Sequence, residues 1–135
     1  MAELTVTVES LRGHQAVGQQ EEDGVLPLDR PIQTGGSGLG FNGGHLMLLA
    51  WGACYKSTLV AAAEARQIEV AVLRLTIRGE LAQTPARISE VNMEIELATD
   101  ASEDDEGKLM EIARNGCAVS NTLARAADMQ IRRVR

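Results

Sequence analysis

The stretch over residues 46–66 constrains the fold most. It contains no proline and is rich in alanine, which favours a helix of several turns. Its first half, residues 46–55, carries no charged side chain on any face of the helical wheel. We therefore expect a long central helix that is buried on nearly every side.

Alternating patterns predict strands on both sides of this helix. Residues 3–9 alternate apolar with polar side chains, which is typical of a strand with one buried face. Residues 13–20 and 25–28 are predicted as two further short strands, joined by a polar turn at residues 21–24. Pro27 favours an edge position for the last of these strands, because proline lacks the backbone N–H that an inner strand donates.

The second half of the chain predicts a hairpin followed by helices. Residues 69–80 and 87–98 alternate apolar with polar side chains and are separated by a turn at residues 83–85. Ser102 is expected to cap a helix that ends near Arg114, because acidic residues fill its first turn. A short helix over residues 118–127 and a closing strand over residues 129–134 complete the prediction. This order indicates an α+β fold in one domain over residues 1–135, with antiparallel sheets packed against helices.

Composition excludes several classes of function. The 135 residues carry 13 basic and 19 acidic side chains, a net charge of -6, so the surplus of positive charge that binds nucleic acid is absent. The chain begins without a basic and apolar leader, so we expect a cytoplasmic protein. No membrane span is expected, because the uncharged run over residues 31–55 begins with a polar, glycine-rich loop.

Two cysteines, Cys54 and Cys117, are the candidates for chemistry. In a reducing compartment they are either buried packing residues or redox-active thiols, and the residues alone leave both readings open. His14 and His45 would complete a set of four zinc ligands, but no pair has the close spacing of a zinc motif, so no metal site is expected. The sequence Gly-x-Ser-x-Gly of many hydrolases does not occur.

Two segments carry a resemblance to a known family. Residues 42–59 read N-G-G-H-L-M-L-L-A-W-G-A-C-Y-K-S-T-L, and residues 115–123 read N-G-C-A-V-S-N-T-L. They resemble the two cysteine signatures of the OsmC/Ohr family, the osmotically inducible and organic hydroperoxide resistance proteins. In the second signature Ala118 stands where the family has proline. The resemblance implies the OsmC-like fold, in which two chains form an intertwined homodimer with active sites at the subunit interface.

The resemblance also implies a thiol peroxidase. Cys54 would attack an organic hydroperoxide and become a sulfenic acid, and Cys117 would condense with it to form a disulfide. An external dithiol of the dihydrolipoyl type, or another thiol reductant, would restore the thiols, so no bound cofactor is expected. By order in the chain, Arg12 matches the arginine that activates the first cysteine in the family, with Arg30 as the second choice.

The substrate pocket is expected around the apolar helix. Phe41, Leu49 and Trp51 would supply its walls, together with the neighbouring His45. Gly44 stands where the family has the glutamate that pairs with the arginine, and no carboxylate occurs between Arg30 and Glu64. This departure favours a second reading, a non-catalytic module of the same fold that binds a small apolar ligand near Trp51 and Cys54.

Overall fold

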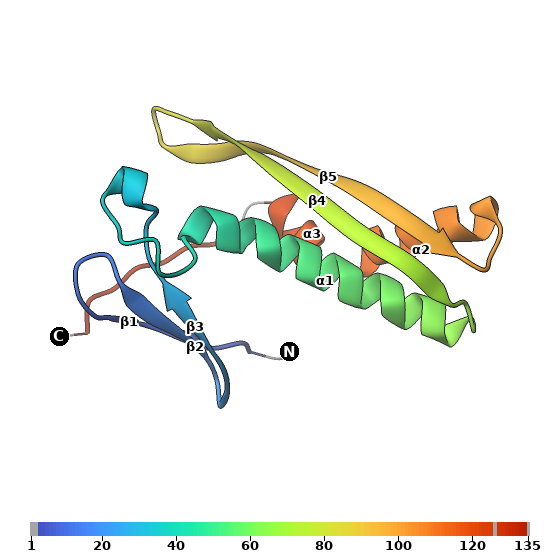
Figure 1. Cartoon of the computed structure of the whole chain (residues 1–135), viewed down its shortest axis with the longest axis horizontal. Helices are drawn as coiled ribbons and strands as arrows, with labels where there is room; N and C mark the ends of the chain where they lie inside the picture. The colour runs from blue at the N-terminus through green and yellow to red at the C-terminus, as the bar shows by residue number, and fades with distance from the viewer. Residues whose placement is uncertain (1–2, 126, 135) are drawn as a thin grey trace. The chain divides into compact units, whose positions relative to one another are not determined.

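The computed structural model describes residues 3–125 and 127–134. The chain has an α+β fold with antiparallel sheets and a long helix, as predicted (Figure 1). Contacts within the chain divide it into two compact units, Met1–Met47 and Leu48–Arg135.

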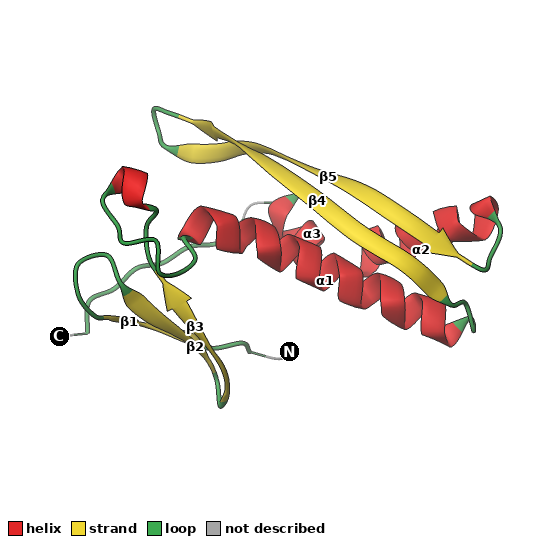
Figure 2. Cartoon of the chain, in the orientation of Figure 1, coloured by secondary structure: helices red, strands yellow, loops and turns green. Residues whose placement is uncertain are grey.

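The first unit contains a three-stranded antiparallel sheet in the order β1-β2-β3 (Figure 2). Its strands are β1 (Val6–Ser10), β2 (Ala16–Gln20) and β3 (Asp23–Leu28). Pro27 lies opposite Val17 on β3, an outer strand of the sheet, so the predicted edge position is confirmed.

The buried face predicted for residues 3–9 is wrong. Val6 and Val8 are each 68% exposed, and together with apolar residues of β3 and with Leu46 they line an open pocket of about 410 Å³. The alternation correctly identified a strand with an apolar face. It could not identify a covering layer, and the described residues of the first unit, 3–47, supply none for this face.

A glycine-rich loop follows β3 and is organised by Asp29, which is buried. The Asp29 carboxylate accepts backbone N–H groups of Arg30 (2.7 Å), Ser37 (3.0 Å) and Leu39 (3.1 Å) around the short 3-10 helix η1 (Ile32–Thr34). Burial raises the pKa of Asp29, but these hydrogen bonds and the charge of His14 together lower it by more. The pKa of Asp29 therefore lies below its ordinary value.

The long helix α1 (Gly43–Ala65) begins three residues before the predicted start. Asn42 explains the earlier start, because its Oδ1 accepts the backbone N–H of His45 at 2.9 Å. By length and composition alone α1 could cross a membrane, a test that core helices of soluble proteins also pass. Its buried residues pack within the second unit, where it serves as the core helix.

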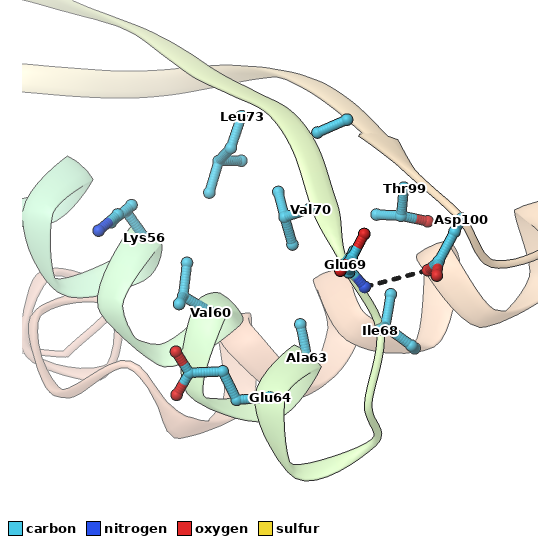
Figure 3. Close-up of a pocket in the computed structure, with 11 residues that line it drawn as sticks. Lys56, Val60, Ala63, Glu64, Ile68, Glu69, Val70, Leu73, Thr99 and Asp100 are labelled. Atoms are coloured by element: carbon cyan, nitrogen blue, oxygen red, sulfur yellow. Dashed lines mark hydrogen bonds between the residues drawn. The ribbon is translucent and has the colours of Figure 1, made fainter.

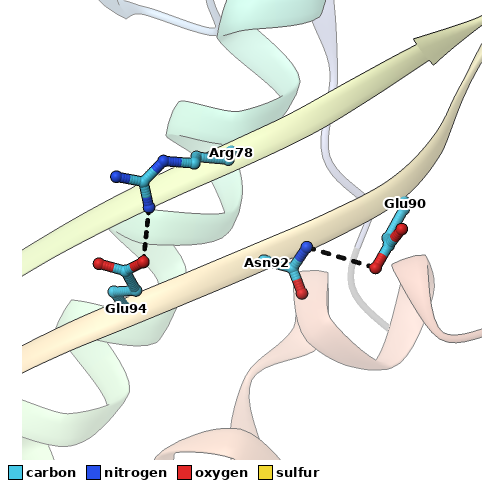
Figure 4. A network of polar contacts seen from close by, with 4 residues as sticks. All are labelled: Arg78, Glu90, Asn92 and Glu94. Carbon is cyan, nitrogen blue, oxygen red and sulfur yellow. Dashed lines mark hydrogen bonds and ion pairs between the residues drawn. The ribbon is translucent and has the colours of Figure 1, made fainter.

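The hairpin of β4 (Val70–Ala82) and β5 (Arg87–Thr99) lies along α1 and confirms the predicted pair of strands (Figure 1). Leu75, Met93 and Ile95 pack toward the core. The other face is polar and carries an exposed ion pair of 2.7 Å between Arg78 and Glu94 (Figure 4). Exposed pairs of this kind contribute little to stability.

Helix α2 (Glu103–Gly116) covers another face of α1 and is followed by α3 (Ala118–Leu123). The predicted cap of α2 is confirmed, since the Ser102 side chain accepts the backbone N–H of Asp105. The buried core joins α1 to α2 and to the link between α2 and α3. Its members are Tyr55, Leu59, Ala62, Ala63, Leu109, Ala113 and Cys117.

Two further predictions are wrong. Helix α1 is not buried on nearly every side, since Leu49 is 51% exposed and Ala50 and Ala53 are also exposed. The hairpin and α2 cover only part of its circumference. Residues 129–134 form no strand in the described part of the chain, because a strand needs a hydrogen-bonded neighbour and none pairs with them there.

Candidate functional site

The structure places Cys54 and Cys117 together. Cys54 lies in the middle of α1 and is partly buried, whereas Cys117 lies between α2 and α3 and is fully buried. The chain turns at Cys117, which ends α2 and begins α3 with extended backbone angles. Both thiols are free, and Cys54 packs against the buried cluster that contains Cys117, where its thiol is one of the groups that lower the pKa of Cys117.

Hydrogen bonds stabilise the thiolate form of Cys117. Burial raises its pKa, but the hydroxyl and backbone N–H of Ser120, the thiol of Cys54 and the backbone N–H of Val119 lower it by more. The backbone donor of Ser120 lies 3.4 Å from the sulfur. The pKa of Cys117 therefore lies below the ordinary thiol value, which favours a nucleophilic sulfur at a buried position.

Two aromatic residues of α1 flank this thiol pair. The Trp51 indole Nε1 donates to the Ser120 hydroxyl at 2.7 Å, and the Tyr55 hydroxyl donates to the backbone carbonyl of Met110 at 3.1 Å. Burial raises the pKa of Tyr55, and the nearby Cys117 sulfur raises it further, so the phenol stays neutral. The sequence analysis did not identify Tyr55 and Ser120 as site residues. Tyr55 lies in the first cysteine signature and Ser120 in the second.

A pocket of about 550 Å³ opens beside Trp51 and Tyr55. Its walls are mainly apolar and come from β5, α2 and α3, with Asn92, Arg114 and Ser120 as polar members. Cys54 is not among the described residues that line it.

A second pocket of about 780 Å³ lies along the C-terminal half of α1 and the start of β4 (Figure 3). Lys56 and Glu64 of α1 are among its lining residues, and the backbone N–H of Glu69 donates to Asp100 at 3.0 Å (Figure 3). Neither thiol is among the described residues that line this pocket.

The other predicted site residues lie as follows. Leu49 is an exposed residue of the second unit, whereas Arg12, Arg30, Phe41 and His45 belong to the first unit. Arg12 lies in the turn between β1 and β2, where its carbonyl accepts the backbone N–H of Gln15. Phe41 forms an isolated bridge with Leu28.

The His45 ring pairs with Asn42 at the start of α1, with 2.7 Å between its Nδ1 and the side-chain oxygen of Asn42. Over residues 3–125 and 127–134, no three His, Cys, Asp or Glu side chains gather in an arrangement that could hold a metal ion.

Solved structures with this fold come from several bacteria. An OsmC-like protein from Mycoplasma pneumoniae is 21% identical with a TM-score of 0.80, and the match covers 93% of this chain and 89% of that one. An organic hydroperoxide resistance protein OsmC from Legionella pneumophila is 19% identical with a TM-score of 0.64, covering 91% and 90%. One from Elizabethkingia anophelis is 18% identical with a TM-score of 0.63, covering 93% and 90%.

No curated protein matches the chain. The family model described as OsmC-like protein matches residues 35–132, which include both cysteines and all of the hairpin. This match spans well over half of the chain and agrees with the resemblance of the two cysteine segments. The chain therefore belongs to the OsmC-like protein family.

Proposed function

We propose that this protein is a thiol peroxidase that reduces organic hydroperoxides. The observation that carries the proposal is the contact between Cys54 and Cys117, in which a partly accessible thiol lies against a buried sulfur stabilised as a thiolate. A peroxidatic cysteine needs such a partner to prevent its oxidation beyond the sulfenic acid. Membership of a family that includes organic hydroperoxide resistance proteins supports the substrate class.

In the first step Cys54 loses its thiol proton and the resulting thiolate attacks the terminal oxygen of the hydroperoxide. The O–O bond breaks, the sulfur gains that oxygen with its hydrogen as a sulfenic acid, and the alkoxide takes a proton to leave as an alcohol. The thiolate supplies the two electrons. The guanidinium of Arg12 is the proposed group that stabilises the Cys54 thiolate and the leaving oxygen, as the family resemblance implies.

In the second step the Cys117 thiolate attacks the Cys54 sulfur. The S–S bond forms, the S–O bond breaks, and hydroxide leaves and takes a proton to become water. An external dithiol of the dihydrolipoyl type, or another thiol reductant, then reduces the disulfide and is itself oxidised. Cys54 is the proposed attacking residue because Cys117 is 0% exposed and a substrate has no direct path to it.

The active form is proposed to be a cytoplasmic homodimer. Exposed apolar residues on β1 and on the first half of α1, such as Val8 and Leu49, offer surfaces that a second copy of the chain would cover. Phe41, His45, Leu49 and Trp51 are the proposed contacts of the alkyl part of the substrate.

A second candidate is a non-catalytic module that binds a small apolar ligand. Two observations favour it: Gly44 stands in place of the family glutamate, and an apolar pocket of about 550 Å³ lies beside Trp51. That volume is in the range of ordinary small-molecule sites.

Hydroperoxide consumption separates the two candidates. The protein is mixed with cumene hydroperoxide and reduced dihydrolipoamide, and the remaining peroxide is measured over time for the wild type, Cys54→Ser and Cys117→Ser. A peroxidase turns over many times as wild type, loses all activity as Cys54→Ser, and loses the disulfide route as Cys117→Ser. The absence of consumption by the wild type, or equal consumption by Cys54→Ser, would overturn the proposal.

A further inference from the structure

Trp51 makes a hydrogen bond in addition to the apolar contacts of its ring. Its indole Nε1 donates to the Ser120 hydroxyl at 2.7 Å and so links α1 to α3. An indole N–H is only a donor, whereas a serine hydroxyl has one proton and two lone pairs. Because the Trp51 N–H occupies a lone pair of this hydroxyl, the Ser120 proton is left to point to another acceptor.

The sulfur of Cys117 lies beside Ser120 and can act as an acceptor for this proton. The backbone N–H of Ser120 donates to this sulfur at 3.4 Å, and the Ser120 hydroxyl is also one of the groups that favour its thiolate form. The donors that stabilise the sulfur are neutral, so their number and orientation decide how well a buried negative charge is held. Trp51 orients one of them.

We propose that Trp51 and Ser120 form a hydrogen-bond relay that positions the Cys117 sulfur for its attack on Cys54. Both are positioning residues, because they act through Cys117 and do not contact the hydroperoxide in this role. The step they serve is the one in which the S–S bond forms and hydroxide leaves Cys54. That role rests on the proposed peroxidase function, whereas the relay itself is independent of any peroxide.

The relay predicts a change in the titration of Cys117. In a Cys54→Ser background Cys117 is the only thiol, and the NMR shift of its Cβ carbon reports the thiolate directly as the pH changes. We expect Ser120→Ala to raise the midpoint by about one pH unit, since a hydrogen bond to a charged group is lost. Trp51→Phe should raise it by a smaller amount, and Ser120→Thr, which keeps the hydroxyl, should restore it.

Met93→Leu is the matched control, because Met93 lines the same pocket through apolar contacts and should leave the midpoint unchanged. Thermal unfolding of each variant shows whether it is folded under the titration conditions. Equal midpoints for wild type and Ser120→Ala would overturn the relay, and so would a shift in Ser120→Ala without any shift in Trp51→Phe.

A second readout tests the role in the reaction. After several equivalents of cumene hydroperoxide, Ser120→Ala with both cysteines present should form the disulfide several-fold more slowly and accumulate more sulfinic acid at Cys54, because a second hydroperoxide then oxidises the sulfenic acid before Cys117 attacks it. Mass spectrometry measures both products. An unchanged ratio of disulfide to sulfinic acid would overturn that role. Failure of the proposed peroxidase function would give a different pattern. The wild type would then form neither the disulfide nor the sulfinic acid, while Ser120→Ala would still shift the titration midpoint of Cys117.

Discussion

The Tyr55 hydroxyl donates to the backbone carbonyl of Met110 at 3.1 Å and joins α1 to α2 beside Cys117. Tyr55 is only 4% exposed, so this is a buried polar contact across the core of the second unit. Tyr55→Phe removes the donor and keeps the ring. We expect the free energy of unfolding to fall by about 1 kcal/mol, measured by urea denaturation. An unchanged midpoint at an unchanged slope would show that this hydrogen bond adds no net stability.

Gly52 and Gly107 should respond to alanine in opposite ways. A Cβ at Gly52 would lie 2.6 Å from the Cδ1 of Ile77, whereas a Cβ at Gly107 in α2 meets nothing within 4 Å. Gly107→Ala should stabilise the protein by about 0.5–1 kcal/mol through helix propensity. Gly52→Ala gains the same helix propensity but must displace the Ile77 side chain. We therefore expect its free energy of unfolding to fall by about 1 kcal/mol.

Thermal or urea unfolding of the two alanine variants measures both effects in the same unit. Stabilisation by Gly52→Ala equal to that by Gly107→Ala would contradict close packing between α1 and β4.

Asp29 should make the glycine-rich loop sensitive to acid. Backbone hydrogen bonds hold its pKa in the folded protein below the ordinary value of 3.8. The charged carboxylate therefore stabilises the loop at pH values above the ordinary pKa. This contribution is lost as the pH falls through the lowered pKa of the folded protein. The amide NMR signals of Ser37 and Leu39 should shift in this acid range. Asp29→Asn should abolish that titration, and a titration that persists in the variant would contradict the assignment.

Cys117 should make the reduced protein more stable as the pH rises toward 9. Its pKa in the folded state lies below the ordinary value of 9.0, so the thiolate contributes stability above that value and loses it as the pH falls through the lowered pKa. Urea midpoints of the reduced protein should rise over this window more steeply than those of Cys117→Ala. Parallel pH profiles for the two proteins would contradict a stabilised thiolate.

Local patterns predicted most of the elements, and contacts between elements account for the rest. Alternation found the hairpin because one face of β5 is buried against α1, and Ser102 marked the start of α2. The same pattern failed at residues 129–134 and misjudged the face that holds Val6 and Val8. A pattern reports which surface is apolar, whereas a pairing strand or a covering layer depends on distant parts of the chain.

The candidate site divides in a similar way. Cys54 and Cys117 were identified from sequence, but only the resemblance suggested that they meet, because spacing along a chain carries no information about distance across a core. Ser120 lay within the second signature without an assigned role, since its role depends on the direction of the Trp51 indole. The activating role of Arg12 remains a prediction.

The most direct test of the two-thiol account is a thiol count with intact mass, taken before and after the reduced protein meets one equivalent of an alkyl hydroperoxide. The account predicts the loss of both thiols and of the mass of two hydrogen atoms. Cys54→Ser should keep its remaining thiol, and Cys117→Ser should gain one oxygen atom instead, with a second oxygen atom only after further hydroperoxide is added. Two intact thiols in the treated wild type would contradict the account and direct attention to a ligand in the pocket beside Trp51.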